Sequence, residues 1–448
     1  MHSTRRQFLR AALTGAAVLP VAGRTRAFDL LASPSPPVSD LTLLDEIERA
    51  AFEFFWNEAN PETGLVLDRA SASGGGPRGM ASIAATGFGL TALCIGYERK
   101  YGPRIQIEER VAKTLRFLAN NAPAQHGFLF HFVESATAKR CGISEVSPID
   151  MSILLCGALT CREYFHSADI RRDATRIYNR VEWPWALNGG NTFALEWTPE
   201  YGFSHLRWDA YCESMMLYLL AMGSSTHPIP AECWQAIRRP QMVYQGHRFI
   251  SSPAPLFVHQ FSHAWFDFRD KHDDYANYFE NSVIASLAHR EFCTELGQRF
   301  PCYSGDVWGI TASDSSEGYV VWGGPPMLGP IDGSLVPAAS AGSLPFLFPE
   351  SIAVLRNLRT YYGQQIWKRY GFVDAFNPLT GWVSKDVVGI DVGISMLMAE
   401  NVRSQFVWNT FMRNSEAITA VQRAGFLPDG FEVPLVASTA RQDETRRG

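Results

Sequence analysis

The sequence predicts an all-α protein whose helices form an (α/α)6 barrel (toroid), with long loops and one short β-hairpin. Three observations lead to this fold class. Apolar residues recur at helical spacing along most of the chain, and few segments alternate as a strand does. Some helical segments are apolar on every side, whereas others keep a polar face. The composition changes nowhere as it would at an interdomain linker.

Helices account for most of the predicted secondary structure. Residues 41–56 begin the series, with Leu44, Ile47, Ala51 and Phe55 on one face. Further helices are predicted at residues 81–100, 105–121, 148–166, 169–183, 209–222, 273–296, 349–362, 364–370, 389–401, 403–412 and 415–424.

Non-helical structure is expected in three places. Residues 71–79 form a glycine-rich turn, and residues 127–140 form the hairpin, because GFLFHFVE alternates as a strand does. Residues 300–349 are rich in Gly, Pro and Asp and are interpreted as long, ordered loops.

The helices differ in amphipathicity in a way that predicts two layers. Those at 148–165, 209–222 and 389–400 are apolar all round, and those at 41–56, 105–121 and 273–296 carry a polar face. An all-apolar helix is surrounded by protein, whereas an amphipathic helix has a side in water. Two concentric layers satisfy both requirements. A helical solenoid would fit too, but the chain shows no fixed-period repeat.

The two ends of the chain differ in sequence pattern from the predicted domain between them. Residues 1–27 have the layout of a twin-arginine signal peptide: Arg5 and Arg6, a short apolar run, and small residues near Ala27. We therefore expect export to the periplasm or beyond, with an N-terminally anchored form as the alternative. One domain is expected over residues 41–426, and the polar tail 434–448 is expected to be loose. No later segment reaches the roughly 18 continuous apolar residues of a membrane helix.

Composition narrows the class of partner. The net charge is -5 without a basic block, which argues against nucleic acid. The 12 Trp, 15 Tyr and 29 Phe can build a large core and leave rings for stacking on sugars. The eight cysteines form no C-x-x-C pair, so metal clustering is not indicated. We expect no cofactor. Four of them are expected to be core thiols: Cys94, Cys156, Cys161 and Cys212.

The stretch WDAYCESMMLYLLAMGS raises a question about Glu213. Within the helix predicted at 209–222, nearly every residue from 210 to 222 is apolar apart from Glu213 and Ser214, so this carboxylate is interior to an apolar helix. Burying an unpaired carboxylate costs several kcal/mol or forces it to take up a proton. Either an Arg or Lys neutralises Glu213, or its acidity is used in catalysis.

Three further carboxylates lie at the starts of the other apolar helices. Asp150 opens one of them, with Glu145 five residues earlier, and Asp391 opens another. Helix capping is the alternative role for Asp150 and Asp391. Hydrolysis of a glycosidic bond needs one protonated and one ionised carboxyl group, and an apolar setting keeps the acid protonated. Glu213, Glu145, Asp150 and Asp391 are therefore the candidate catalytic residues.

Polar side chains interleaved with aromatic rings suggest a groove for a glycan, although a satisfied polar network under a loop would look the same. The chain shows no H-E-x-x-H, G-x-S-x-G or phosphate-loop motif. The candidate substrate-binding residues are Trp208, Tyr211, Gln260, His263, Trp265, Asp267, Arg269, Trp308, Asp314, Tyr319, Trp322, Phe376 and Trp382.

Seven motifs in order resemble the glucoamylase-like domain of glycoside hydrolase family 144. They are SEVSPIDMSILLCGAL, WDAYCESMMLYLLAMGSSTHPI, HQFSHAWFDFRD, WGITASDSSEGY, DGSLVPAASAGSLPF, YGFVDAFNP and GIDVGISMLMAENVRSQFVWNTFM, and the resemblance spans residues 41–426. It implies an (α/α)6 barrel without a metal and anomer-inverting hydrolysis of β-1,2-glucan to sophorose or short sophoro-oligosaccharides. It also implies that Glu213 is the general acid and that Glu145 is a base or orients substrate.

The chain departs from this family's pattern in places. Val392 and Ile394 stand where a Gln and a Pro are expected, Val307 follows Asp306 where an Arg is common, and Cys212 precedes Glu213. If Val392 lies in the sugar pocket, one hydrogen-bonding side chain is lost, and such a loss can change substrate choice by orders of magnitude. The sequence therefore supports the reaction class, hydrolysis of a glycosidic bond, more directly than it supports the β-1,2 linkage of the substrate.

Three alternatives stay open at this point. The first is a hydrolase or transglycosylase of another glucan linkage, and the second is a non-catalytic periplasmic glycan-binding protein. The third, a polysaccharide lyase, would need a Tyr or His base and a site for a uronate, and no compelling arrangement of that kind is present. Chain length preference, endo or exo action, the carboxylate that activates water, disulfide pairing and the oligomeric state are likewise open.

Overall fold

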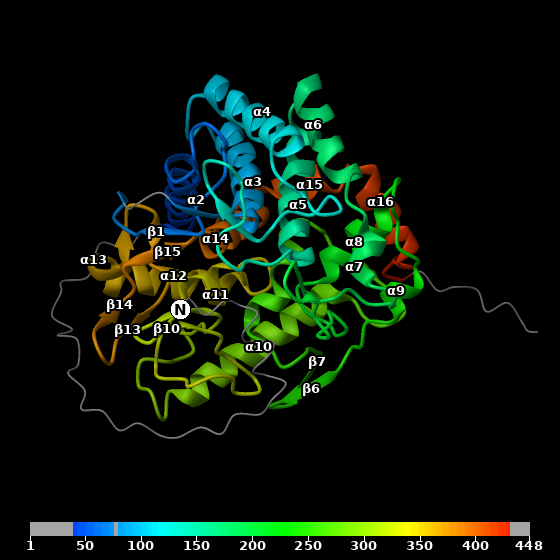
Figure 1. The fold of residues 1–448 in the computed structure, drawn as a ribbon. Helices are drawn as coiled ribbons and strands as arrows, with labels where there is room; N and C mark the ends of the chain where they lie inside the picture. The colour runs from blue at the N-terminus through cyan, green and yellow to red at the C-terminus, as the bar shows by residue number, and fades with distance from the viewer. Residues whose placement is uncertain (1–38, 76–78, 431–448) are drawn as a thin grey trace, which may run out of the picture.

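The computed structural model describes residues 39–75 and 79–430. The predicted signal peptide and the predicted loose tail lie outside these residues. Helices α2 to α6, α8 and α14 to α16 fill the upper part of Figure 1, and α10 to α13 with most of the short strands lie below them. No helix in the described ranges is long and apolar enough to cross a membrane.

The helices of the described residues are mostly of ordinary length, and a few are single turns. Their bounds are α2 (Asp40–Asn57), α3 (Ile83–Arg99), α4 (Arg104–Asn120), α5 (Pro148–Tyr164), α6 (Ala168–Asn179), α7 (Trp183–Leu187), α8 (Met215–Gly223), α9 (Glu232–Gln235), α10 (Tyr278–Leu296), α11 (Pro337–Ala341), α12 (Phe348–Asn357), α13 (Gly363–Ile366), α14 (Gly389–Ser404), α15 (Phe406–Phe411) and α16 (Ser415–Arg423), with 3-10 turns η1 (Leu256–His259) and η2 (Ser262–Ala264) and a π-helical turn η3 (Leu358–Tyr362).

Most predicted helices are confirmed, and three differences have physical reasons. α8 begins at Met215, six residues later than predicted, because residues 209–214 form a bridge and turns instead. α6 ends at Asn179, since α7 starts anew with a proline in its first turn. The predicted loop 300–349 contains α11, whose five residues are too few to show helical periodicity.

Buried helices follow one another as neighbours. α14 packs against α3, α3 against α5, and α5 against α8. The turns η1 and η2 continue the series, because Ser262 Oγ accepts a hydrogen bond from Met216 N of α8 and Gln260 Nε2 donates one to Ala339 O of α11. α11 in turn packs against α14.

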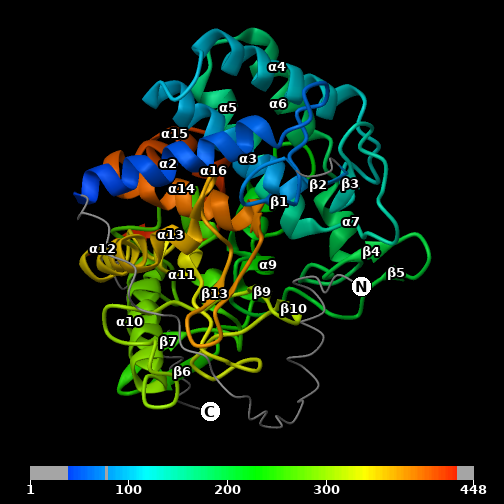
Figure 2. The same ribbon diagram turned by 90° about the vertical axis from the view of Figure 1, so that its left-hand side faces the viewer.

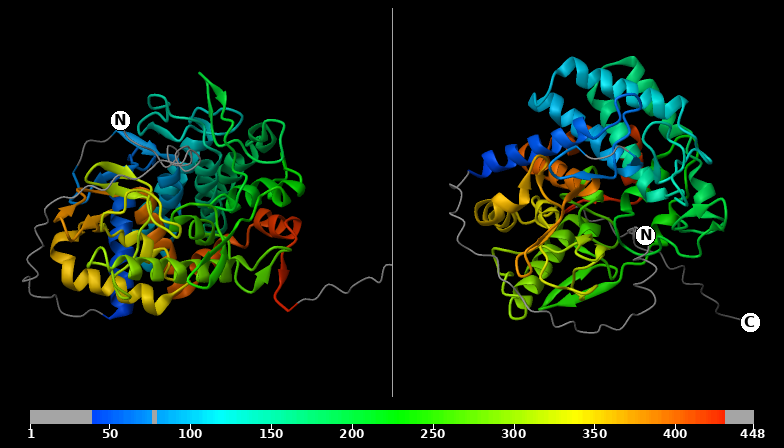
Figure 3. Two further views of the ribbon diagram at one scale, coloured as in Figure 1. Left: turned by 90° about the horizontal axis from the view of Figure 1, so that it is seen from below. Right: turned by 60° about the vertical axis from the view of Figure 1, so that its left-hand side comes forward.

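A second set of helices covers the first from outside. α2 lies on α14 and α3, α4 on α3, α6 on α4 and α5, α16 on α8, α10 on η1, and α12 on α11 and α2. Figure 2 shows α2 running alongside α14, and the right-hand view of Figure 3 shows α4 (cyan) above α2 (blue) and α14 (orange) below it. Almost all of α3, α5, α8 and α14 is buried, whereas α2, α4, α6 and α16 keep an exposed face, which confirms the predicted division.

The strands of the described residues form two-stranded antiparallel ladders. Their pairs are β1 (Arg69–Ser71) with β15 (Asp386–Val388), β2 (Met80–Ser82) with β3 (Phe132–Glu134), β4 (Trp197–Thr198) with β5 (Gly202–Phe203), β6 (Gln241–Tyr244) with β7 (His247–Ile250), β8 (Lys271–His272) with β16 (Leu427–Pro428), β9 (Ser313–Ser315) with β10 (Gly318–Val320), β11 (Trp367–Lys368) with β12 (Gly371–Phe372), and β13 (Phe376–Asn377) with β14 (Trp382–Val383).

The prediction of a hairpin at residues 127–140 is only partly right. β3 lies in this segment, but its ladder partner is β2, fifty residues earlier in the chain. Only a bridge between Val133 and Arg140 closes the segment on itself. A local alternation pattern identifies a strand but not a distant partner.

Two glycines allow α3 and α5 to pack backbone against backbone. A Cβ atom on Gly157 of α5 would lie 2.1 Å from the carbonyl oxygen of Gly87, and one on Gly87 of α3 would lie 2.3 Å from that of Ile153. The two backbones touch directly, so no side chain fits between α3 and α5. This contact fixes the position of the start of α5, where Asp150 lies.

Candidate active site

Several inner helices begin at one end of the molecule, and short ladders tie their first turns together. β2 leads into α3 and β15 leads into α14, and the carbonyl of Asp68 accepts a hydrogen bond from Gly389 N at the start of α14 (2.7 Å). β3, paired with β2, precedes the start of α5. The candidate residues Asp150 and Asp391 both lie in the first turn of their helices, where the helix dipole favours a negative charge.

Asp150 and Glu145 share a histidine. His131 Nδ1 lies 2.9 Å from Glu145 Oε1, and its Nε2 lies 3.5 Å from Asp150 Oδ1. Ser147, the N-cap of α5, accepts from Asp150 N (3.2 Å) and donates to Asp150 Oδ2. Asp150 therefore takes part in the cap, as one alternative held, and also contacts an imidazole that joins it to Glu145.

Glu213 does not lie inside a helix. It occupies the turn directly before α8 and is buried, with 5% of its surface exposed. Ser262 Oγ donates to the carbonyl of Glu213 (2.8 Å) and accepts from Met216 N (3.0 Å), so η2 holds this turn in place. The prediction of an interior helical position is thus wrong, whereas the prediction of a buried carboxylate is confirmed.

Arg69 lies close to three further carboxylates at the end of the molecule where the inner helices begin. Arg69 Nη1 lies 3.0 Å from both carboxylate oxygens of Asp314. Its Nε lies 3.6 Å from Asp68, and its Nη1 lies 3.8 Å from Asp386. Asp314 also accepts from Ser384 Oγ (3.3 Å). Although burial opposes the charge, Asp314 and then Asp68 raise the pKa of Arg69 above its ordinary value.

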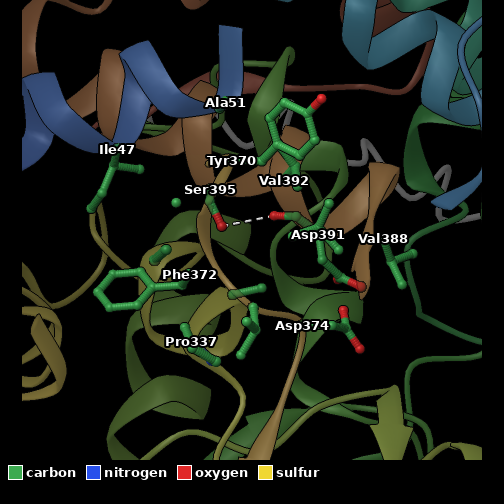
Figure 4. A pocket seen from close by; sticks show the side chains of 15 residues that line it. Ile47, Ala51, Pro337, Tyr370, Phe372, Asp374, Val388, Asp391, Val392 and Ser395 are labelled. Carbon is green, nitrogen blue, oxygen red and sulfur yellow. Dashed lines mark hydrogen bonds between the residues drawn. The ribbon is translucent and has the colours of Figure 1, made fainter. Parts of the chain in front are cut away.

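Asp374 and Asp391 meet beside this arginine cluster. Both line a cavity between α2, α11 and α14, together with Val392 and Ser395. Figure 4 shows their carboxyl groups directed to the same side of the cavity, while Ser395 Oγ donates to the carbonyl oxygen of Asp391 (2.7 Å). The N-cap of α14, Val388, has no side-chain cap hydrogen bond.

Burial shifts the acidity of several of these groups. Burial raises the pKa of Asp374 well above its ordinary value, and the charges of Asp391 and Asp314 raise it further. Burial likewise raises the pKa of Asp68, with Asp314 and Asp150 adding to the effect and Arg69 opposing it. These couplings place Asp68, Asp150, Asp314, Asp374 and Asp391 within one electrostatic neighbourhood.

Most of the predicted substrate-binding residues lie in the core. Gln260 is held by Ala339 O and Ser343 Oγ, and Trp265 donates to Thr91. Burial lowers the pKa of His263 to about 3, so this side chain stays neutral. The buried members of the predicted set are Trp208, Tyr211, Gln260, His263, Trp265, Trp308, Trp322 and Phe376.

Asp267 and Arg269 are not brought together with the carboxylates. They form a two-bond ion pair (2.8 Å each), and Arg269 also donates to Gln405 (3.0 Å) at the far end of α14. Asp391 and Gln405 are fourteen residues apart on one helix, so about 20 Å separates the pair from Asp391. The other partly exposed members of the predicted set, besides Asp267 and Arg269, are Asp314, Tyr319 and Trp382, of which Asp314 and Tyr319 are partners in the β9–β10 ladder.

Sequence reasoning missed His131, Asp68, Arg69, Asp374 and Asp386. Asp374 lies in the quoted motif YGFVDAFNP and His131 in GFLFHFVE, so both were visible but not singled out. Asp68 and Arg69 reach the site only because β1 pairs with β15, more than 300 residues later. No local pattern reveals such a pairing.

Within the described ranges, no group of three or more His, Cys, Asp or Glu side chains could hold a metal ion. The cysteines predicted to be core thiols are buried and unbridged, and Cys94 Sγ lies 3.5 Å from Cys161 Sγ between α3 and α5.

Comparison with known proteins identifies a matching family model and a similar curated protein. Residues 205–415 match the Glycoamylase family model, described as "Putative glucoamylase". Among curated proteins, an exo β-1,2-glucooligosaccharide sophorohydrolase (non-reducing end) from Parabacteroides distasonis is 28% identical over 86% of this chain. This chain spans 58% of that relative's length.

Solved structures agree in fold. An endo-β-1,2-glucanase from Chitinophaga pinensis, in complex with sophorotriose and glucose, has a TM-score of 0.82 at 28% identity and covers 87% of this chain and 99% of that one. A β-1,2-glucanase from Parabacteroides distasonis has a TM-score of 0.81 at 27% identity and covers 87% of this chain and 60% of that one. These matches confirm the predicted resemblance, and the sophorohydrolase and glucanases among the relatives are named as glucan-cleaving hydrolases. The helix-rich fold is that of the glucoamylase-like glucanases.

Proposed function

We propose that this chain, a glucoamylase-like glycoside hydrolase by its relatives, cleaves β-1,2-glucan by inverting acid/base hydrolysis and releases sophorose or short sophoro-oligosaccharides. The observation that carries the proposal is the convergence of carboxyl groups on the first turns of the inner helices, in a chain similar to β-1,2-glucanases over most of its length. The linkage comes from those relatives. The reaction class also follows from the carboxyl groups themselves.

The predicted (α/α)6 barrel is the architecture we infer for this site. Its support is the order of contacts: α3, α5, α8, η1 with η2, α11 and α14 follow one another as neighbours, and α11 returns to α14. An outer helix covers each position of this series. In such a ring the first turns of the inner helices face one mouth, and a glycan lying across that mouth meets Asp150 and Asp391.

Glu213 is the proposed general acid. It is buried in the turn before α8, and burial opposes ionisation of a carboxyl group. In the reaction its proton passes to the glycosidic oxygen as the C1–O bond breaks, and water adds to C1 from the opposite face of the sugar. That water loses a proton to a carboxylate, so one proton is donated and one is accepted in the reaction.

Three carboxylates are candidates for the base. Asp391 lies next to Asp374, whereas Glu145 and Asp150 are joined through His131. The ionised partner must accept a proton at neutral pH, and the first turn of a helix stabilises its negative charge. Asp150 and Asp391 meet this condition, and Glu145 is better suited to orient substrate through His131.

The decisive experiment compares Glu213→Gln with the parent protein on β-1,2-glucan, measuring new reducing ends and glucan binding. Loss of a general acid costs roughly 10²–10⁴ in rate, while the isosteric amide should keep the fold and the affinity. Asp150→Asn and Asp391→Asn should fall by a similar factor if each is in contact with the reacting groups. Turnover of Glu213→Gln near the parental rate would remove Glu213 from this role.

A panel of β-1,2-, β-1,3-, β-1,6- and α-linked glucans tests the linkage. Chromatography of the products should show sophorose or its oligomers from the β-1,2 polymer and little release from the others. Proton NMR at early times should show the α-anomer, since inversion at a β-linkage produces it. Binding without reducing-end release on every polymer would instead indicate a non-catalytic glycan-binding protein.

We also propose that the chain acts in the periplasm or outside the cell. The support is the Arg5–Arg6 pair followed by an apolar run and small residues near Ala27. Replacing both arginines by lysine should retain the full-length protein in the cytoplasm, as fractionation and immunoblotting would report. Undiminished export of that variant would remove the twin-arginine route.

A further inference from the structure

Asp374 occupies the most enclosed corner of the acidic site. It is 4% exposed and lies in the segment that joins β12 to β13. Its backbone N–H donates to Asp386 O (3.1 Å), so this segment runs beside β15, the strand that leads into α14. Asp374 is thereby fixed next to the first turn of α14, where Asp391 lies.

The two oxygens of Asp374 have different surroundings. Oδ2 accepts a hydrogen bond from the backbone N–H of Asp314 (2.7 Å). Oδ1 is buried and has no hydrogen-bond partner. A buried oxygen of an ionised carboxylate without a donor is costly, whereas the same oxygen carrying a proton needs only an acceptor nearby. In the cavity that the two residues share, the Asp391 carboxylate is directed to the same side and is the acceptor nearby.

The charged groups around Asp374 are mostly negative. Asp391 on α14, Asp314 on β9 and Asp386 on β15 carry carboxylates, and Arg69 on β1 carries the opposing charge. Arg69 itself is bound to both oxygens of Asp314. One guanidinium cannot neutralise every carboxylate here, and a proton on one of them relieves the repulsion.

We propose that Asp374 is held as the neutral acid and acts as a positioning residue, so that Asp391 stays ionised and oriented toward the sugar. The proposal rests on the proposed function, because it gives Asp391 a role in the reaction. The raised pKa of Asp374 agrees with it. Asp374 itself makes and breaks no bond in the reaction.

The first test compares the pH profiles of kcat for Asp374→Asn and Asp374→Ala with that of the parent protein. The amide keeps shape and a hydrogen-bond donor, so Asp374→Asn should stay within about tenfold of the parental rate, whereas Asp374→Ala should lose about a hundredfold because Asp391 is misplaced. As pH rises, ionisation of Asp374 puts a second negative charge beside Asp391. The alkaline limb should therefore move to higher pH in Asp374→Asn, which cannot ionise.

The second test is infrared spectroscopy of the protein without substrate at neutral pH. The difference spectrum between the parent and Asp374→Asn should contain the C=O band of one protonated carboxylic acid, because the bands of Glu213 and Glu48 are common to both proteins and cancel. Asp173→Asn is the matched control: Asp173 is a buried carboxylate of α6 bound by Arg172, so its removal should leave both the band and the activity unchanged.

The two measurements separate this proposal from the proposed function. A parent protein inactive on β-1,2-glucan would remove the function, and the infrared band would still report the proton on Asp374. A difference spectrum without that band, or a pH profile of Asp374→Asn identical to the parent's, would overturn the inference.

Discussion

Replacing Arg69 by Gln tests whether this one cation stabilises the acidic site, that is, the carboxylates of Asp68, Asp314 and Asp386 with the neighbouring Asp374 and Asp391. Arg69 has 27% of its side chain exposed and lies within 3.0–3.8 Å of Asp314, Asp68 and Asp386. At an effective dielectric constant of about 20, one charge pair near 4 Å is worth about 4 kcal/mol. The remaining two carboxylates add to this, and the desolvation of Arg69 subtracts. Removing one partner of such a pair costs about 3–5 kcal/mol.

The loss of stability in Arg69→Gln should depend on pH. Arg69 opposes the rise in the pKa of Asp68 that burial causes, so its removal raises that pKa further. A carboxyl with a raised pKa in the folded state binds protons more tightly there than in the unfolded chain, so stability falls as pH rises. The cost should be about 3–5 kcal/mol at pH ~7. It should shrink toward about 1 kcal/mol at pH ~4, where protonated carboxyls leave only a lost hydrogen bond.

Urea unfolding followed by tryptophan fluorescence at both pH values measures these free energies. Arg172→Gln is the matched control, because Arg172 also contacts two aspartates but is 60% exposed, so water screens its ion pairs and its loss should cost much less than that of Arg69. Combining Arg69→Gln with Asp314→Asn should recover part of the stability, since it removes the uncompensated charge. An equal loss at both pH values would refute the electrostatic reasoning.

Two more predictions follow from contacts away from the reacting groups. Gly157→Ala should destabilise by about 3 kcal/mol or more, because its Cβ would meet the carbonyl of Gly87 at 2.1 Å, while Gly79→Ala, with no atom within 4 Å of the added Cβ, should be near neutral in thermal unfolding. A Gly157→Ala protein as stable as the parent would show that α3 and α5 can separate without loss. Asp267→Asn should leave kcat/KM for β-1,2-glucan within about twofold of the parent, since its ion pair with Arg269 lies at the other end of α14; a hundredfold loss would place substrate there after all.

Features that depend on residues close together in the sequence could be predicted, whereas features that depend on contacts between distant residues could not. Helix positions and the two classes of helix follow from local periodicity, so α2, α5 and α14 agree with prediction within two or three residues. The start of α8 does not, because apolar composition continues through residues 209–214 while Ser262 and a bridge from Ala210 to Arg238 hold that segment as turns. Burial of Glu213 was predictable from its neighbours, but its backbone conformation was not.

The site itself shows the same division. Carboxylates at helix starts could be recognised from the chain, whereas the aromatic and polar residues of HQFSHAWFDFRD were assigned to a groove on composition alone. In the structure Gln260, His263 and Trp265 fill the joint between η2, α11 and α3. A ring that can stack on sugar and a ring that fills a core are the same residue type, and only burial separates them.

The arrangement of charge explains why the acidic residues concentrate at this end. The first turns of α5 and α14 stabilise Asp150 and Asp391 as anions, and Arg69 neutralises Asp314. Burial raises the free-energy cost of each additional negative charge here. Asp374 is the least exposed of the carboxyl groups beside Asp391. A hydrolase needs a proton donor and an ionised acceptor at the same pH. Helix dipoles stabilise some carboxylates as anions and burial favours the protonated form of others, so one residue type provides both groups.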